Sequence, residues 1–363
     1  MTSAATGPML LADARLHEAL RSYVGARAQQ VDSCEVTIRE GIAHLADLGA
    51  TELGVFGVHR PEDFTLQCEV VGTIALDCMS QAFSLWCHRM ATEYLHQADT
   101  DSVARARFLP LVRSGATLGS TSFAAATANY LAGTPLPLTF RREGDHLVVN
   151  GRIAWASNLQ PPFVSVAAAV NEDDPTERIV FAYTEATPGL QLGGYPEILA
   201  LQATSSTSPA FKDAIVTEDD ILTRDFEPFV ARVLATFLLL QCSFCWGLAT
   251  RSLDEAAQQL EGPKTVLAPA YEEIRERLGS VEARLRAYSS HPHREEIEHR
   301  ALLQLRLDAG RLAVESVALE SKLAGGRGYM LHSGTARRLR EAAFLPVQSP
   351  TEIQLQWLLA RSA

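Results

Sequence analysis

Lysine is scarce in this chain, and no segment is rich in basic residues. Only three of the 363 residues are lysines (Lys212, Lys264 and Lys322), and the formal net charge at pH 7 is −11. Because nucleic-acid binding needs clustered lysines and arginines that neutralise phosphates, we expect no nucleic-acid partner. The composition is nevertheless that of a globular protein, since hydrophobic residues make up 47% of the chain and charged residues 21%.

Signals for export and for membrane insertion are weak or missing. Residues 1–16 contain no basic segment followed by an apolar one, so no signal peptide is expected. The one long uncharged run, residues 233–250, is just long enough to span a bilayer, but it holds a glutamine, a serine, two threonines and a glycine. We therefore expect a buried core helix there, and a cytoplasmic protein without a membrane span.

The six cysteines all lie in apolar stretches with helical periodicity. Cys242 and Cys245 have the spacing of a redox or zinc motif, but they lie within an apolar run rather than at the start of a helix that follows a strand. We expect buried free thiols in a reducing compartment. His291, His293 and His299 stand among glutamates and arginines typical of a solvated helix start, so no metal site is expected.

The residue pattern divides the chain into three parts. Apolar residues at helical spacing dominate residues 1–115, whereas glycine, proline and β-branched residues become frequent in 116–223 and helical spacing returns in 224–363. A continuous apolar pattern over residues 65–97 predicts one long buried helix. Helices, then a β insert, then helices again predict an α+β chain with one mixed core.

The central part predicts a small antiparallel barrel or sandwich. Asn150 and Gly151 stand between two apolar runs, and this pair predicts the turn of a β-hairpin because both residues tolerate positive φ. Apolar, β-branched runs at 163–170 and 178–184 predict two further strands.

The last part predicts three long helices and two short ones, separated by a glycine-rich break. Their expected ranges are 226–260, 266–290, 294–323, 334–344 and 351–361. Arg337, Arg338 and Arg340 form a small basic cluster on the first short helix. Two interpretations stay open: a helix surface with Arg340 paired to a carboxylate, or a site for the phosphates of CoA or of a carrier protein.

The order of these parts and three motifs resemble the acyl-CoA dehydrogenase superfamily. Residues 144–158 (GDHLVVNGRIAWASN) are similar to the family's strand–turn–strand motif. Residues 199–222 (LALQATSSTSPAFKDAIVTEDDIL) are similar to its serine- and threonine-rich segment. In residues 324–354, the glycines, Tyr329, Arg340 and Thr351 fall into register with the family's C-terminal run without gaps.

The resemblance implies a fold and a cofactor. It implies an N-terminal helical domain (1–115), a central antiparallel β domain (116–223) and a C-terminal four-helix bundle (224–363), assembled as a homodimer or homotetramer. It also implies that FAD lies between the β domain and the C-terminal helices. Trp155 would pack on the flavin ring and Ser157 would hydrogen-bond near its reactive nitrogen. The implied cofactor-binding residues are Phe123, Ala125, Trp155, Ser157, Gly325, Gly326, Gly328, Tyr329 and Thr351.

The chain departs from the family at the position of the catalytic base. The family uses a carboxylate to remove the α-proton of a thioester, and desolvation tunes the pKa of that carboxylate. Ser349 occupies the usual position and Phe237 the alternative one, so neither carries an acid. Glu352 lies three residues away but out of register. Lys264 is the only cation near the position where the family has an arginine for the FAD pyrophosphate.

Three functions follow from this pattern of retained and lost residues. The first is a flavin-dependent oxidoreductase acting on an acyl or aminoacyl thioester of CoA or of an acyl carrier protein, in specialised metabolism, with an electron-transfer partner or O₂ as acceptor. The second is a monooxygenase that uses reduced flavin and O₂ and needs no glutamate base. The third is a non-catalytic or redox-neutral paralogue, which the loss of the pyrophosphate arginine supports.

Overall fold

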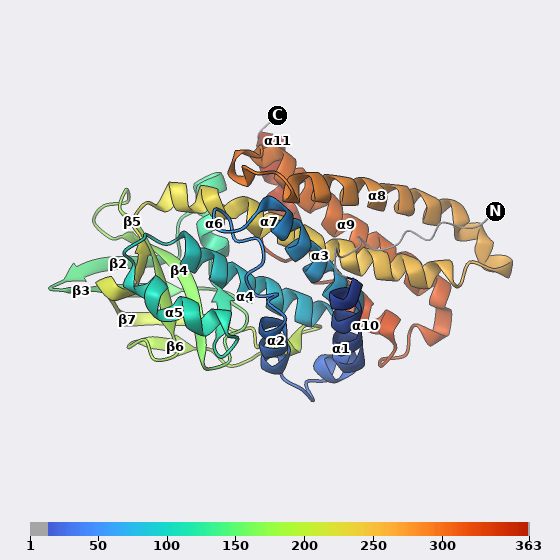
Figure 1. Ribbon diagram of the computed structural model, residues 1–363, viewed down its shortest axis with the longest axis horizontal. Helices are drawn as coiled ribbons and strands as arrows, with labels where there is room; N and C mark the ends of the chain where they lie inside the picture. The colour runs from blue at the N-terminus through green and yellow to red at the C-terminus, as the bar shows by residue number, and fades with distance from the viewer. Residues whose placement is uncertain (1–13, 362–363) are drawn as a thin grey trace.

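The computed structural model describes residues 14–361. Figure 1 shows an elongated molecule with the sheet at one end and the long helices extending toward the other. The predicted absence of a signal peptide concerns residues 1–16 and so falls almost entirely outside the described range. The first part of the chain forms helices α1 (Ala14–Asp32), α2 (Ile38–Asp47), α3 (Pro61–Asp77), α4 (Met79–Gln97) and α5 (Val103–Arg113).

The predicted single helix over residues 65–97 is two helices, because the chain breaks at Cys78. Its backbone is extended, with φ −155° and ψ 107°. The Glu341 carboxylate, 262 residues further along, accepts a hydrogen bond from the Met79 amide at 3.2 Å and so satisfies one of the unpaired donors at the start of α4. A tertiary cap therefore stabilises a break that the apolar pattern does not reveal.

The central part forms a mixed sheet and one additional helix. Its elements are β1 (Leu118–Thr121), α6 (Ala124–Ala132), β2 (Leu138–Glu143), β3 (His146–Arg152), β4 (Phe163–Asn171), β5 (Arg178–Thr184), β6 (Leu190–Leu192), β7 (Pro209–Thr217) and β8 (Ile221–Thr223). The strand order is β6-β7-β3-β2-β4-β5-β8, with β1 beside β4. Most pairs are antiparallel, but β1 and β2 both run parallel to β4, so the sheet is not wholly antiparallel.

The predicted hairpin turn at Asn150 and Gly151 is wrong, because both residues lie within β3. Glu143 pairs with His146, so Gly144 and Asp145 form the turn between β2 and β3. Gly151 instead marks a bulge against β7, with φ +127°, and a Cβ there would lie 2.1 Å from the carbonyl oxygen of Pro137. The tolerance of Gly151 for positive φ is used, but in a bulge rather than in a turn.

The last part packs three long helices side by side, as Figure 1 shows. They are α7 (Phe226–Ala257), α8 (Ala268–Ser289) and α9 (His299–Ala324), followed by α10 (Gly334–Ala342) and α11 (Glu352–Arg361). The apolar window of α7 is long enough to cross a membrane, but it is entirely buried inside the protein. That burial agrees with the expected core helix. The division of the chain into three domains, with boundaries at residues 115/116 and 223/224, stays a prediction.

Candidate functional site

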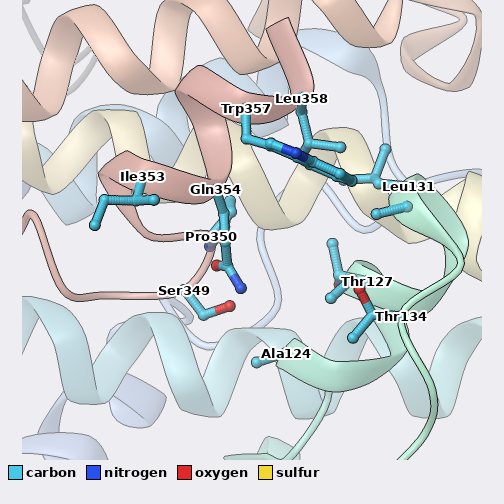
Figure 2. A pocket seen from close by; sticks show the side chains of 12 residues that line it. Ala124, Thr127, Leu131, Thr134, Ser349, Pro350, Ile353, Gln354, Trp357 and Leu358 are labelled. Carbon is cyan, nitrogen blue, oxygen red and sulfur yellow. The ribbon is translucent and has the colours of Figure 1, made fainter. Parts of the chain in front are cut away.

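A cavity of about 280 Å³ lies between α6 and the segment that leads into α11. Figure 2 shows Ser349, Gln354 and Thr127 around this space, with the ring of Trp357 across from Thr134. The lining residues are Ala124, Thr127, Ala128, Leu131, Ala132, Thr134, Ser349, Pro350, Ile353, Gln354, Trp357 and Leu358. None of them is ionisable at neutral pH, so the cavity wall is apolar with a few hydroxyl and amide groups.

The α6 wall is held in place at its C-terminal half. Its last turn ends at Gly133, whose φ of +67° gives a left-handed cap, and the Asn129 side chain donates to the Thr134 carbonyl at 2.8 Å. Asn129 also accepts from Arg178 of β5 at 3.1 Å. These contacts fasten α6 to the sheet and fix the small residues of one helix face toward the cavity.

The α11 wall begins with a reciprocal cap. The Thr351 hydroxyl accepts from the Gln354 amide at 3.2 Å, and the Gln354 side chain accepts from the Thr351 amide at 2.8 Å. Arg300, near the start of α9, donates to the Leu359 carbonyl at 2.7 Å. Thr351, which the resemblance assigns to the cofactor, therefore serves in this chain as a helix cap beside the cavity.

A buried arginine fixes the segment that carries Ser349. Arg306 of α9 donates to the Gln241 side chain at 2.8 Å and to the Gln348 side chain at 3.0 Å. Gln241 in turn donates to the Ser349 carbonyl at 3.0 Å. Within residues 14–361 Arg306 makes no ion pair, so this guanidinium is held by neutral groups alone.

Trp155 lies on the sheet side, where the chain leaves β3. Its indole is 58% exposed. Nearby, the Ser157 hydroxyl lies 2.7 Å from that of Ser206, and the Ser157 carbonyl accepts from Ser120 of β1 at 2.6 Å. Asn158, buried and in a left-handed conformation, exchanges hydrogen bonds with Ser84 of α4. The predicted flavin contacts therefore stand on a rigid junction of β1, β3 and α4.

The structure brings some predicted site residues together. Ser349 lines the same cavity as Ala124, which lies between Phe123 and Ala125 in the chain. The Phe123 side chain is fully buried and packs against Tyr94, with ring centroids 4.7 Å apart, so only its backbone can face a ligand.

Among residues 14–361, no carboxylate lines the cavity beside Ser349, where a base would be needed. No hydrogen bond joins the Ser349 hydroxyl to any residue of the described chain, and His332 is exposed in the loop before α10. Glu352 points to Arg311, 2.8 Å away. Phe237 is buried in an aromatic cluster with Trp86, at 5.0 Å between ring centroids. Glu352 is therefore already paired, and the Ser349 hydroxyl lacks the partner a serine base needs.

The glycine-rich segment lies far from Trp155 within one chain. Gly325 ends α9 with φ +58°, and Gly328 packs so closely that a Cβ there would lie 2.5 Å from Ala324. The start of α9 contacts α6 through His299 and Tyr130, whose ring centroids are 5.6 Å apart. Since α9 has 26 residues, its far end is about 40 Å away from this contact.

Lys264 and Tyr329 share that distant end. Figure 1 shows the connection between α7 and α8, which contains Lys264, at the end of the molecule opposite the sheet. Tyr329 is almost fully exposed there, followed by exposed Met330 and Leu331. The predicted flavin-ring residues and the predicted adenosine-side residues are thus two separate groups within one chain.

The arginines of α10 are engaged with acidic or carbonyl groups. Arg338 forms two hydrogen bonds with Glu320, at 2.9 and 2.5 Å, and Arg340 pairs with Asp32. Arg337 donates to the Asp77 carbonyl at 2.7 Å. Pairing of Arg340 with a carboxylate, one of the two interpretations left open, is what the structure contains.

The remaining candidate groups, the cysteine pair and the histidine group, lie in the core or on the surface. Cys242 and Cys245 are fully buried, and burial raises the pKa of the Cys245 thiol to about 11, which suits a core thiol rather than a reactive one. His293 groups with Glu295 and Glu296 at a turn open to solvent, an arrangement common without a metal.

Sequence reasoning missed the α11 half of the cavity. Ile353 and Trp357 lie four residues apart on one helix face and are 79% and 46% exposed, an i, i+4 apolar pair that the helical spacing contained. Thr127, Ala128 and Leu131 likewise share a face of α6, but nothing in the sequence indicates that this face opposes α11.

The fold is that of flavin-dependent acyl-CoA dehydrogenases. The structure of a glutaryl-CoA dehydrogenase complex has a TM-score of 0.84 and 16% identity, covering 96% of this chain and 93% of the other. PigA, solved with FAD and proline, has a TM-score of 0.83 and 14% identity, covering 96% of each chain. No protein-family model matches the chain.

A curated relative agrees with the fold. The mitochondrial short-chain specific acyl-CoA dehydrogenase of Mus musculus is 26% identical over 235 residues, which are 60% of this chain. The match spans 56% of that relative's length. Together with the fold, this similarity agrees with the resemblance to the acyl-CoA dehydrogenase superfamily that the motifs carry.

Proposed function

We propose that this protein is an FAD-dependent oxidoreductase that acts on an acyl or aminoacyl thioester carried by CoA or by an acyl carrier protein. The observation that carries the proposal is the exposed side chain of Trp155, two residues before Ser157, whose hydroxyl lies 2.7 Å from that of Ser206. An exposed tryptophan of this kind gives a planar cofactor a large apolar contact.

The chain's residues fit the ring half of FAD. Bound flavin would supply the two-electron chemistry. Trp155 would hold the ring by its apolar face, and the Ser157 hydroxyl, kept in place by Ser206, would hydrogen-bond at its polar edge. The backbone around Phe123 and Ala125 would line the neighbouring side, where the start of α6 leaves room for the cavity.

The adenosine half requires a second copy in this proposal. Gly325, Gly326, Gly328 and Tyr329 lie at the opposite end of the molecule, so they would serve the cofactor of a neighbouring subunit. We therefore propose a homodimer or homotetramer. The cytoplasmic location and the domain division at 115/116 and 223/224 belong to the same proposal.

The first experiment is an absorbance spectrum of the purified protein from 300 to 600 nm, with mass spectrometry of any released chromophore. We expect a flavin band and FAD. The Trp155→Ala variant should lose flavin, whereas Leu199→Ala, at another exposed apolar residue of the central part, should retain it. A colourless protein that binds neither oxidised nor reduced flavin would support the non-catalytic paralogue instead.

A second candidate is a monooxygenase that uses reduced flavin and O₂. The specific observation in its favour is that no lining residue of the cavity beside Ser349 is ionisable within the described part of the chain, because this reaction does not need a carboxylate base. Binding of reduced but not oxidised flavin, with O₂ consumption that depends on a thioester, would favour it over dehydrogenation with an electron-transfer partner.

A further inference from the structure

Backbone hydrogen bonds tie the segment around Ser157 to the loop that precedes β7. Ala156 and Thr207 form an isolated bridge and exchange two hydrogen bonds, both 2.9 Å long. The Asn158 amide donates to the Thr204 carbonyl at 2.7 Å. Because these bonds involve the residues on both sides of Ser157, they fix the position of its backbone relative to the loop.

Three hydroxyls form a chain between these two segments. The Ser157 hydroxyl lies 2.7 Å from that of Ser206, and the Ser206 hydroxyl lies 2.8 Å from that of Thr204. At the far end, the Thr204 hydroxyl donates to the Leu201 carbonyl at 2.7 Å. The Thr204 side chain is fully buried, so solvent does not compete for its hydroxyl.

The bond to the Leu201 carbonyl fixes the direction of the whole chain, because a hydroxyl has one hydrogen to donate. Thr204 uses its hydrogen on that carbonyl, so Ser206 is the donor to Thr204. Ser206 then has no hydrogen left, so Ser157 is the donor to Ser206. Ser157 keeps only its lone pairs for a ligand, and within residues 14–361 no group donates to its hydroxyl.

An oxygen that can only accept distinguishes the two redox states of flavin. The reactive nitrogen of the flavin ring carries a hydrogen in the reduced form and only a lone pair in the oxidised form. Ser157 can accept a hydrogen bond from the reduced form. Facing the oxidised form, it would bring two lone pairs together and leave both acceptors without a donor, which is unfavourable.

We propose that the hydroxyl chain of Thr204, Ser206 and Ser157 holds Ser157 as an acceptor and thereby strengthens the binding of reduced flavin relative to oxidised flavin. Thr204 is then a positioning residue that acts through two other side chains. The inference rests on the proposed function, in which Ser157 hydrogen-bonds near the reactive nitrogen. It deepens that function by naming the redox state that the site favours.

The test compares the affinity of the full chain for oxidised FAD and, without O₂, for FAD reduced by dithionite. The quantity of interest is the ratio of the two dissociation constants. Ser157→Ala should lower the preference for reduced FAD about 10-fold, since a hydrogen bond to one form and a repulsion with the other are both lost. For a two-electron couple, this change lowers the midpoint potential of the bound flavin by about 30 mV, which spectroelectrochemistry measures independently.

Two further variants break the chain without touching Ser157. Thr204→Val removes the hydroxyl that fixes the direction, and Ser206→Ala, at a half-buried residue, removes the middle link. In both, the Ser157 hydrogen is free to turn toward oxidised flavin, so the preference for reduced FAD should again fall about 10-fold. Thr204→Ser keeps a hydroxyl and should keep both the preference and the potential.

Thr207→Val is the matched control for Thr204→Val. The Thr207 hydroxyl is buried in the same loop and also donates to a backbone carbonyl, that of Gly194 at 2.9 Å, but it is no part of the chain. This variant should leave the preference and the potential unchanged.

Three outcomes overturn the inference. They are an unchanged preference in Ser157→Ala or in both chain-breaking variants, a stronger preference for reduced FAD in any of these three variants, and a loss in Thr207→Val as large as that in Thr204→Val. In each case flavin still binds, so the proposed function stands. If the unchanged protein binds neither form of FAD, the proposed function is refuted and this inference with it.

Discussion

The cavity between α6 and α11 and the surroundings of α10 differ in the charge of their side chains. Between α6 and α11, none of the described residues that line the cavity has an ionisable side chain. Around α10, three arginines lie among Glu320, Glu341 and Asp32, and most of these groups are buried. The difference teaches that the arginines of α10 are held inside the fold by acidic or carbonyl partners, whereas the cavity between α6 and α11 is lined by uncharged side chains.

The largest effect on stability is expected when one member of the buried ion pair between Arg338 and Glu320 is removed. Arg338→Ala should lower the free energy of unfolding by ~3–5 kcal/mol, because Glu320 would stay buried without its partner. Chemical denaturation measures the loss. Arg327→Ala, at an exposed arginine nearby, is the control and should change stability little.

Replacing both Arg338 and Glu320 distinguishes the contribution of packing to stability from the contribution of charge. The double variant Arg338→Met/Glu320→Leu should recover most of that stability, since no charge is left unpaired. A double variant as unstable as Arg338→Ala would mean that the ion pair itself, and not its completeness, stabilises this region.

A smaller effect is expected for the buried arginine next to the cavity. Arg306→Met removes a charge that has only neutral partners, so it leaves the side-chain carbonyl oxygens of Gln241 and Gln348 without this donor but leaves no ion unpaired. The expected loss is ~1–3 kcal/mol. Hydrogen exchange should show faster opening of residues 345–350, and unchanged exchange there would contradict a role in holding this segment.

The titration of Glu341 makes the stability of the α10 region depend on pH. Burial raises the pKa of this carboxyl from 4.5 to about 7, with Arg337 acting in the opposite direction. The folded state therefore holds the proton more tightly than the unfolded state, and the stability that the group contributes is complete below pH 4.5 and is lost as the pH rises to 7.

Glu341→Gln keeps an acceptor for the Met79 amide but cannot ionise. Relative to the unchanged protein, the variant should gain ~1–3 kcal/mol between pH 4.5 and 7. Denaturation midpoints of both proteins are measured at a series of pH values. The difference between the two proteins cancels the contributions of the other titrating groups, which both share. A constant difference over this range would show that Glu341 does not titrate there.

The smallest change in stability is expected at Trp155. Because its indole is mostly exposed, Trp155→Ala should alter the free energy of unfolding by less than ~1 kcal/mol while abolishing flavin binding. A large loss of stability would mean that the indole belongs to the packing of the sheet rather than to a binding surface.

Much of the fold followed from local patterns. The strand expected at 178–184 is β5, and the one expected at 163–170 is β4 with one more residue. The three long helices of the last part begin within five residues of their expected starts. Periodicity and turn residues act over a few positions, so one chain suffices to recognise them.

The misplaced turn and the missed helix break have a different origin. Asn150 and Gly151 satisfy a turn as well as a bulge, and pairing with β7 decided between them. The extended backbone of Cys78 separates α3 from α4, and the distant Glu341 caps the start of α4 there. In both places the local preference was compatible with two structures, and contacts distant in sequence selected one.

The sequence by itself carried the resemblance to the superfamily, and it determined the α+β class, the core nature of α7 and the lack of an acid at position 349. Tertiary structure alone decided which arginines find carboxylates, that Trp155 and the glycine-rich segment lie at opposite ends, and that α6 and α11 enclose an uncharged cavity. The physical reason is that composition and periodicity report what each segment can bury, whereas a site depends on which segments meet.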